Sequence, residues 1–264
     1  MAIVVSESDL IETYDQPGEI TAHEAVEQYR RVIEFQAMHP HKKSAAASTA
    51  LGLPRGRIRG WMEDGSAPDA FRGVDVALTK GWIESESIDT QRNLTVLLAG
   101  IFSGGGLSSE FYVPSWTVDE SQPIVTDWIE SALRELGAGV TYRHVDAENR
   151  STEIIPGENR SVLGRVFLCL GAPTGSKGDT ENVMLPGWLF EAPDELREAF
   201  CEVYLRNRLS PLAGKQTGPV LEERSEDFRV QLCELLESIG VEARVGDRYV
   251  NVSFDSLPFD VRVS

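Results

Sequence analysis

The sequence is poor in lysine and lacks both a long apolar run and a secretory leader. Lysine supplies only 5 of the 25 basic residues, against 42 acidic residues, and the net charge is −17. No apolar run approaches the roughly 20 residues that a membrane-spanning helix needs. The first ten residues, MAIVVSESDL, have neither the charged start nor the long apolar core of a secretory signal. We therefore expect a cytoplasmic protein that does not enter a membrane.

Cysteine is also scarce, and there is no Cys-x-x-Cys pair that could begin a metal site. Cys169, Cys201 and Cys233 occur singly among apolar neighbours, as the small buried residues that free cysteines usually are. His39 and His41 form a close pair but lack a third ligand nearby. The sequence therefore predicts no metal and no cofactor.

The acid excess would normally argue against a nucleic-acid partner. Combined with scarce lysine, however, it is similar to the composition of proteins from salt-rich cytosols, such as those of halophilic archaea. In that setting the acidity is an adaptation to the solvent and does not exclude DNA. The alternative is an acidic protein of an ordinary cytosol that binds a protein partner.

The basic residues are unevenly distributed along the chain. Residues 1–29 hold seven acids and no Lys or Arg, and residues 61–264 hold 34 acids against 18 basic residues. Between them, residues 30–60 carry seven basic residues and one acid, a net charge of +6. Such a basic segment predicts contact with phosphate, unless it docks on the acidic remainder of the chain. Its members are Arg30, Arg31, Lys42, Lys43, Arg55, Arg57 and Arg59.

The basic segment coincides with three predicted helices. Thr21 and Glu24 form a capping-box pattern that begins the first, which ends at His39-Pro40. The second spans residues 44–51, SAAASTAL, and Gly52-Leu53-Pro54 supplies the turn into the third, residues 54–62. Two helices joined by a short glycine-containing turn are typical of the helix-turn-helix, whose second helix enters the major groove.

On this third helix Ile58 and Trp61 are spaced to anchor a core, so some of Arg55, Arg57 and Arg59 must point outward. Guanidinium groups suit guanine edges and phosphates because they donate two parallel hydrogen bonds. The stretch from residue 44 to 71 also resembles helix-turn-helix families with the pattern A–LG-P–IR-W–G–P. The resemblance implies binding to double-stranded DNA. The alternative is an ordinary three-helix packing unit.

These patterns divide the chain into domains. We expect a flexible amino terminus over residues 1–20 and a helix-turn-helix domain over 21–83, whose last helix spans Phe71 to Ile83 with Val74, Leu78 and Trp82 on one face. The polar stretch 84–91 predicts a linker. Residues 92–264 form the remaining domain.

The segment LAGIFSGGG, residues 98–106, resembles the nine-residue LAGLIDADG motif of homing endonucleases. In that family small residues of the motif helix pack against a twin helix, and the eighth residue is an aspartate that holds the catalytic metal. The two aspartate positions are Ser103 and Gly105 in this sequence. Glycine offers no side-chain oxygen to Mg²⁺. The resemblance therefore implies a motif helix without its metal ligand.

A second, more divergent copy follows. Residues 185–200 are similar to the lead-in to a second motif helix, which would continue through residues 201–209. The same register puts Arg208 at the metal position and Val203 at the packing-glycine position, which would hinder close helix crossing. A predicted helix and strand pair also recurs, over 124–155 and again over 228–254 with a hairpin at Gly246-Asp247. The resemblance covers about residues 92–255, in halves of about 92–175 and 176–264.

Together these features predict an α+β protein: a helix-turn-helix domain, then a pseudo-twofold LAGLIDADG-like region of two αβ halves. We expect a sequence-specific DNA-binding transcriptional regulator with an inactive nuclease-like region, and a homodimer is one form that it could take. One alternative is a DNA endonuclease that uses other acids, such as Glu110. Another is an acidic oligomerisation or ligand-sensing protein. An unrelated α+β domain with helix-hairpin repeats is the alternative for residues 92–264.

Overall fold

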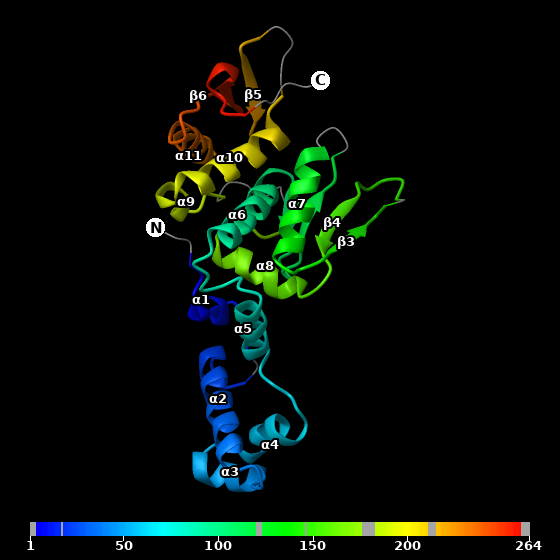
Figure 1. Ribbon diagram of the computed structural model, residues 1–264, viewed down its shortest axis with the longest axis vertical. Helices are drawn as coiled ribbons and strands as arrows, with labels where there is room; N and C mark the ends of the chain where they lie inside the picture. Colours follow the sequence, from blue (N-terminus) through cyan, green and yellow to red (C-terminus); the bar gives the residue numbers. More distant parts are fainter. Residues whose placement is uncertain are drawn as a thin grey trace. The chain divides into compact units, whose positions relative to one another are not determined.

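A computed structural model describes residues 4–16, 18–119, 123–145, 147–175, 183–210 and 215–259. The chain divides into two compact units, which we call the head, Val5–Thr79, and the body, which starts at Lys80. Helices predominate, and the strands form two small antiparallel sheets, both in the body (Figure 1). The predicted α+β class is confirmed.

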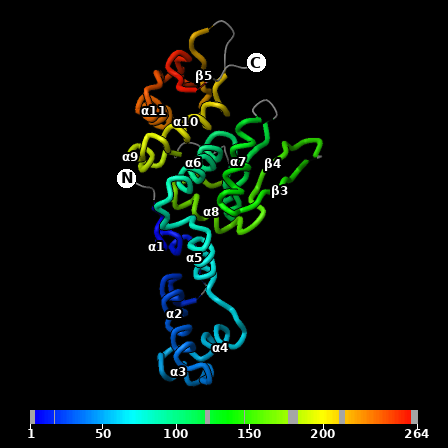
Figure 2. Tube along the Cα trace, viewed as in Figure 1, coloured from blue at the N-terminus to red at the C-terminus, as the bar shows by residue number. Residues whose placement is uncertain are grey.

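The head is helical throughout its described elements. These are α1 (Glu7–Glu12), α2 (Ala22–Met38), α3 (Ser44–Leu51), α4 (Arg55–Glu63) and α5 (Asp69–Thr79). Val32, Phe35, Ala47 and Ile58 form the buried core where α2, α3 and α4 meet. The trace in Figure 2 follows this part of the chain in blue and cyan.

Two local signals set the three helices. The Thr21 hydroxyl accepts a hydrogen bond from the Glu24 amide at 3.1 Å, and the Glu24 carboxylate accepts one from the Thr21 amide at 2.7 Å. This capping box satisfies amides that the first turn of α2 would otherwise leave unbonded. Gly52 then ends α3 at a φ of 66°, a left-handed conformation that favours glycine. Both signals were predicted, and both are confirmed.

The amino terminus differs from the expectation of a flexible segment. Ser6 and Asp9 form a second capping box, which begins α1, and α1 packs on α5. Leu10 and Ile11 are buried in that contact. The prediction was wrong for residues 7–12 because it gave no weight to a short helix that tertiary packing stabilises.

The domain boundary also lies earlier than predicted. Helix α5 ends at Thr79, Leu78 is exposed, and Trp82 belongs to the body, where its indole N–H donates to the Leu136 carbonyl at 2.8 Å. The predicted linker 84–91 is also shortened, because Ser87 caps α6 and Gln91 is buried within that helix. The helical spacing of Trp82 from Leu78 predicted one continuous helix, but it could not show that Trp82 is buried in the body and not in the head.

The body contains two sets of elements in a similar order. The first set is α6 (Ile88–Ser103), β1 (Gly105–Leu107), β2 (Pro114–Thr117), α7 (Pro123–Glu135), β3 (Val140–Arg143), β4 (Glu153–Pro156) and α8 (Arg160–Cys169). The second set is α9 (Trp188–Glu191), α10 (Asp194–Arg208), β5 (Thr217–Leu221), α11 (Glu226–Glu237), β6 (Ala243–Val245), β7 (Tyr249–Ser253) and η1 (Phe254–Ser256). In each set the long helix is followed, after β1 and β2 or after β5, by a helix and a hairpin. The helix and hairpin were predicted from the sequence, whereas β1, β2 and β5 were not.

The sheets have the strand orders β1-β2-β4-β3 and β5-β7-β6, with all neighbours antiparallel. The two long helices, α6 and α10, pack against each other between them (Figure 1). Phe102 of α6 lies with its ring centre 5.9 Å from that of Phe200 of α10. Val203 is buried and does not prevent this contact, contrary to the concern raised by the loss of a packing glycine.

All three cysteines are free thiols; Cys201 and Cys233 are buried and Cys169 is partly buried. Burial raises the pKa of the Cys233 thiol to about 11. These residues fill the core, as predicted. Within the described ranges, no helix is both long and apolar enough to cross a bilayer.

Candidate nucleic-acid interface and a cavity in the body

Helix α4 has one buried and one exposed face. Ile58 is fully buried, and Trp61 packs against the same core. Arg55, Gly56 and Arg59 are exposed. In an α-helix, positions three and four residues apart share a surface. Arg59 is four residues from Arg55 and three from Gly56, so these three residues form one outward stripe, which we call the α4 face.

The three arginines of α4 have different surroundings. Arg55 is exposed and has no polar partner among the described residues. Arg59 lies 3.4 Å from the Glu63 carboxylate, one turn along the helix, and stays largely exposed. Arg57 instead donates a 2.6 Å hydrogen bond to the side-chain oxygen of Gln28 on α2. The structure therefore keeps two of the three predicted recognition residues on the outside, while Arg57 holds α4 on α2.

The predicted phosphate contacts on α2 are occupied. Arg30 forms two 2.8 Å contacts with the Glu7 carboxylate of α1, and the hydrogen bond to Glu7 raises the pKa of its guanidinium. Arg31 donates to the Leu51 carbonyl at 3.3 Å, at the end of α3. Both residues therefore tie helices of the head together, a role that the sequence did not indicate.

The two lysines lie between α2 and α3. Lys42 is exposed, and its side chain has no polar partner among the described residues. Lys43 precedes α3 at its N-cap position. The Ser44 hydroxyl donates at 2.6 Å to Glu63, and this bond, followed by the charges of Arg59 and Lys43, lowers the pKa of that carboxyl. Glu63 therefore carries a negative charge at the far end of the α4 face.

The body contains a partly open cavity of about 580 Å³, which we call the body cavity. Gly105 and Arg208, the two positions that the homing-endonuclease resemblance aligns with metal ligands, both line it. Gly105 must be a glycine because a Cβ there would lie 2.3 Å from the Ser115 carbonyl oxygen. Glu110, the alternative catalytic acid, lies exposed in a turn and does not line this cavity.

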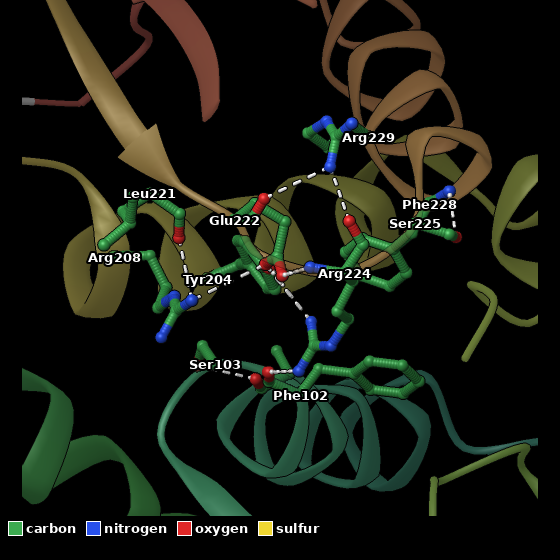
Figure 3. A network of polar contacts seen from close by, with 11 residues as sticks. Phe102, Ser103, Tyr204, Arg208, Leu221, Glu222, Arg224, Ser225, Phe228 and Arg229 are labelled. Atoms are coloured by element: carbon green, nitrogen blue, oxygen red, sulfur yellow. Dashed lines mark hydrogen bonds and ion pairs between the residues drawn. The ribbon is translucent and has the colours of Figure 1, made fainter. Parts of the chain in front are cut away.

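No sequence signal pointed to Glu222, a buried acid that lines the body cavity and lies just past the end of β5. Only 1% of its surface is exposed. Its carboxylate lies 3.3 Å from Arg224 and 3.7 Å from Arg208, and it accepts a hydrogen bond from the buried Tyr204 hydroxyl (Figure 3). Burial, followed by the Glu222 charge, raises the pKa of Tyr204.

Arg224 is held from several sides. It donates to the Phe102 carbonyl at 2.6 Å and to the Tyr204 hydroxyl at 3.2 Å, and its guanidinium lies 4.5 Å from the centre of the Phe228 ring. Across the packed helices, Asn207 of α10 donates to the Ser103 hydroxyl of α6 at 2.8 Å. The carboxyl ends of α6 and α10 are thus joined by the Asn207–Ser103 hydrogen bond, and Arg224, which is paired with Glu222, bonds to the end of α6.

No protein-family model matches the sequence, and no curated protein is significantly similar to it. Among the residues that the structure describes, no three His, Cys, Asp or Glu side chains gather as metal ligands do. The class of the protein therefore has to be argued from the α4 face and the body cavity.

Proposed function

We propose that this chain is a cytoplasmic, sequence-specific DNA-binding regulator of transcription. Its head would bind double-stranded DNA through α4, and its body would be a catalytically inactive relative of homing endonucleases. The α4 face carries the proposal, because Arg55 and Arg59 point outward on a helix that follows α3 through the Gly52 turn. A helix placed in this way enters the major groove in helix-turn-helix proteins.

The chemistry of the α4 face suits DNA. Arg55 and Arg59 lie one turn apart, and each can donate two parallel hydrogen bonds to a guanine edge. Gly56 lies between them, and a Cβ there would meet no other atom within 4 Å. Packing within the head therefore does not require a glycine at this position. A bare backbone on the exposed face permits close approach to a groove.

The charge pattern within the head supports the same surface. Acidic residues concentrate in α1, the first half of α2 and α5, whereas the lysines and the α4 arginines lie around α3 and α4. Helix α2 contacts both groups of helices. Lys42, exposed and unpartnered among the described residues, would add a phosphate contact. A homodimer would offer two such helices to half-sites one DNA turn apart.

The inactive body is supported by the charges of the body cavity. Where the family holds a metal with two aspartates, this chain has Gly105 and Arg208. The one buried acid nearby, Glu222, is already paired with Arg208 and Arg224. Among the residues that the structure describes, Glu222 is the one buried carboxylate that lines the cavity, and the two guanidinium groups beside it repel a divalent cation. The free thiols fit the reducing compartment that the proposal assigns to the protein.

The experiment is selection of duplexes from a random pool by the full-length protein, followed by titration of the selected and a scrambled duplex. The double variant Arg55→Ala/Arg59→Ala should lose at least tenfold in preference for the selected site. Arg72→Ala is the matched control, since Arg72 is an exposed arginine of the head that lies on α5. No enriched sequence, or equal loss in variant and control, would contradict the proposal. Cleavage of either duplex with Mg²⁺ would contradict the inactive body.

A further inference from the structure

We propose that the body cavity binds a small anion that carries phosphate or carboxylate groups. Four arginines line the cavity: Arg208, Arg224, Arg229 and Arg248. They lie in a unit that has 30 acids and 17 basic residues from Lys80 onward, a net charge of −13. A concentration of arginine in one cavity of so acidic a unit calls for an anionic partner. The inference does not depend on DNA binding by the head.

The acids in the cavity wall leave the arginines only partly neutralised. Three acids line the cavity, against four arginines. Glu222 is shared between Arg208 and Arg224, and Glu223 pairs with Arg248. The third, Asp247, lies exposed at the hairpin between β6 and β7. No carboxylate among the described residues pairs with Arg229, so its charge is uncompensated.

Arg208 and Arg229 also retain unused donors. Arg208 donates one terminal nitrogen to the Leu221 carbonyl at 2.7 Å, and Arg229 uses one for the carbonyls of Glu222 and Arg224. The Nε atom of each is buried and has no hydrogen-bond partner among the described residues. Arg229 as a whole is 8% exposed. The terminal nitrogens that these two residues do not use for carbonyls are the donors that an oxyanion in the cavity would find.

Arg224 differs from Arg208 and Arg229 because its donors are used within the fold. Its donors already serve Phe102, Tyr204 and Glu222 (Figure 3). It is therefore a positioning residue that fixes Glu222, and Glu222 in turn lies beside Arg208. The donors left for a ligand come from Arg208, Arg229 and the exposed Arg248.

The size and depth of the cavity favour a small molecule. About 580 Å³ lies within the range of sites for small ligands and cofactors. Gly106 lines the wall, and a Cβ there would meet nothing within 4 Å, so the space beside it is open. A DNA phosphate offers the same chemistry as a free anion. However, a recessed guanidinium such as Arg229 is accessible to a small ion more readily than to a stiff duplex.

The test uses full-length protein and two probes, pyrophosphate and citrate, titrated at constant ionic strength by calorimetry and by thermal melting. Gly106→Leu fills the open space without removing a charge, and Arg208→Gln removes donors without filling it. Either change should weaken binding of at least one probe by tenfold or more. Arg244→Gln is the matched control, because Arg244 is exposed on β6 and does not line the cavity. It should bind both probes as the natural protein does.

Failure to bind either probe at millimolar concentration, or equal binding by all variants, would overturn the proposal. Competition between pyrophosphate and a short duplex that is abolished by Gly106→Leu would support the anion site and assign it to a DNA phosphate. Arg55→Ala/Arg59→Ala should bind pyrophosphate normally. That variant therefore separates failure of the body cavity from failure of DNA binding by the head.

Discussion

The head and the body use arginine in opposite ways. On the α4 face, Arg55 and Arg59 point into solvent, and among the described residues Glu63 is the one carboxylate that pairs with either. In the body, Arg224 and Arg229 are withdrawn from solvent and donate to main-chain carbonyls and to Glu222. An exposed guanidinium keeps its donors for a partner, whereas a buried one must satisfy them within the fold. The head therefore leaves Arg55 and Arg59 largely free of internal acceptors, whereas the body holds Arg224 in place through several of them.

The difference begins with the elements that carry the arginines. Helix α4 is short, has glycine at positions 56 and 60, and buries only the Ile58 side. Arg224 instead follows β5 in the loop before α11, where Phe102, Tyr204 and Phe228 enclose it. Burial of that loop requires internal acceptors, and Glu222 provides the strongest. Its removal should therefore produce the largest effect in the molecule.

Glu222→Ala should lower the free energy of unfolding by about 2–4 kcal/mol, because it leaves two partly buried guanidinium groups and the buried Tyr204 hydroxyl without their partner. Glu223→Ala, one residue on, is the matched control. Glu223 and Arg248 are both mostly exposed, so that pair contributes less than about 1 kcal/mol. Urea unfolding of both variants measures the difference. Equal losses would mean that the Glu222 network does not stabilise the body.

In the head, removal of an exposed basic side chain should weaken DNA binding and leave the free energy of unfolding nearly unchanged. Arg55→Ala should cost about 1–3 kcal/mol of discrimination between the selected and a scrambled duplex. Lys42→Ala should weaken both duplexes alike and reduce the salt slope by about one unit, as expected for a phosphate contact. Anisotropy titrations across a salt series distinguish the two patterns. If both variants behave identically, α4 is not the recognition helix.

How much of this the sequence predicted depends on the range of each signal. The helices around the α4 face follow from signals within a few residues, such as Thr21 with Glu24 and the Gly52 turn. Their boundaries were predicted to within one or two residues. The recurring helix and hairpin of the body (α7 with β3 and β4, and α11 with β6 and β7) was predicted for the same reason. Helix caps and glycine turns depend little on contacts with residues far away in the sequence.

The missed features all depend on contacts between distant residues. Helix α1 exists because Leu10 and Ile11 bury against α5, and it brings Glu7 to Arg30, which was predicted to bind phosphate. Arg57 was assigned to base recognition, yet it bonds to Gln28, 29 residues earlier. Glu222 belongs to no motif, and its partner Tyr204 lies 18 residues away. Side-chain pairing of this kind leaves no periodic pattern in a sequence.

A smaller change can test whether the α4 face itself approaches DNA. Gly56→Ala should stabilise the head by up to about 1 kcal/mol, because alanine favours a helix and the new Cβ meets nothing within 4 Å. The same methyl group should weaken DNA binding if that face lies close to the groove. Thermal melting of Gly56→Ala should therefore show higher stability, and titration with DNA should show lower affinity. Improved stability with unchanged binding would place the DNA elsewhere.

The smallest predicted effect is that of salt, which should stabilise the body and weaken non-specific DNA binding by the head. From Lys80 onward, 30 acids face 17 basic residues, so repulsion among like charges destabilises the body in dilute buffer. The Debye length falls from about 10 Å at 0.1 M salt to about 3 Å at 1 M. We expect the melting temperature of the body to rise by about 2–4 °C in 1 M KCl, which corresponds to no more than about 1 kcal/mol.

Salt also displaces basic side chains from phosphate, so non-specific DNA binding should disappear over the same range. Binding to the selected site should persist, since base-edge contacts depend less on counterions. Thermal melts and titrations in one KCl series measure both trends. A melting temperature that stays flat or falls would show that the acidity is not an adaptation to a salt-rich cytosol, and a protein partner for the acidic surface would then be the better explanation.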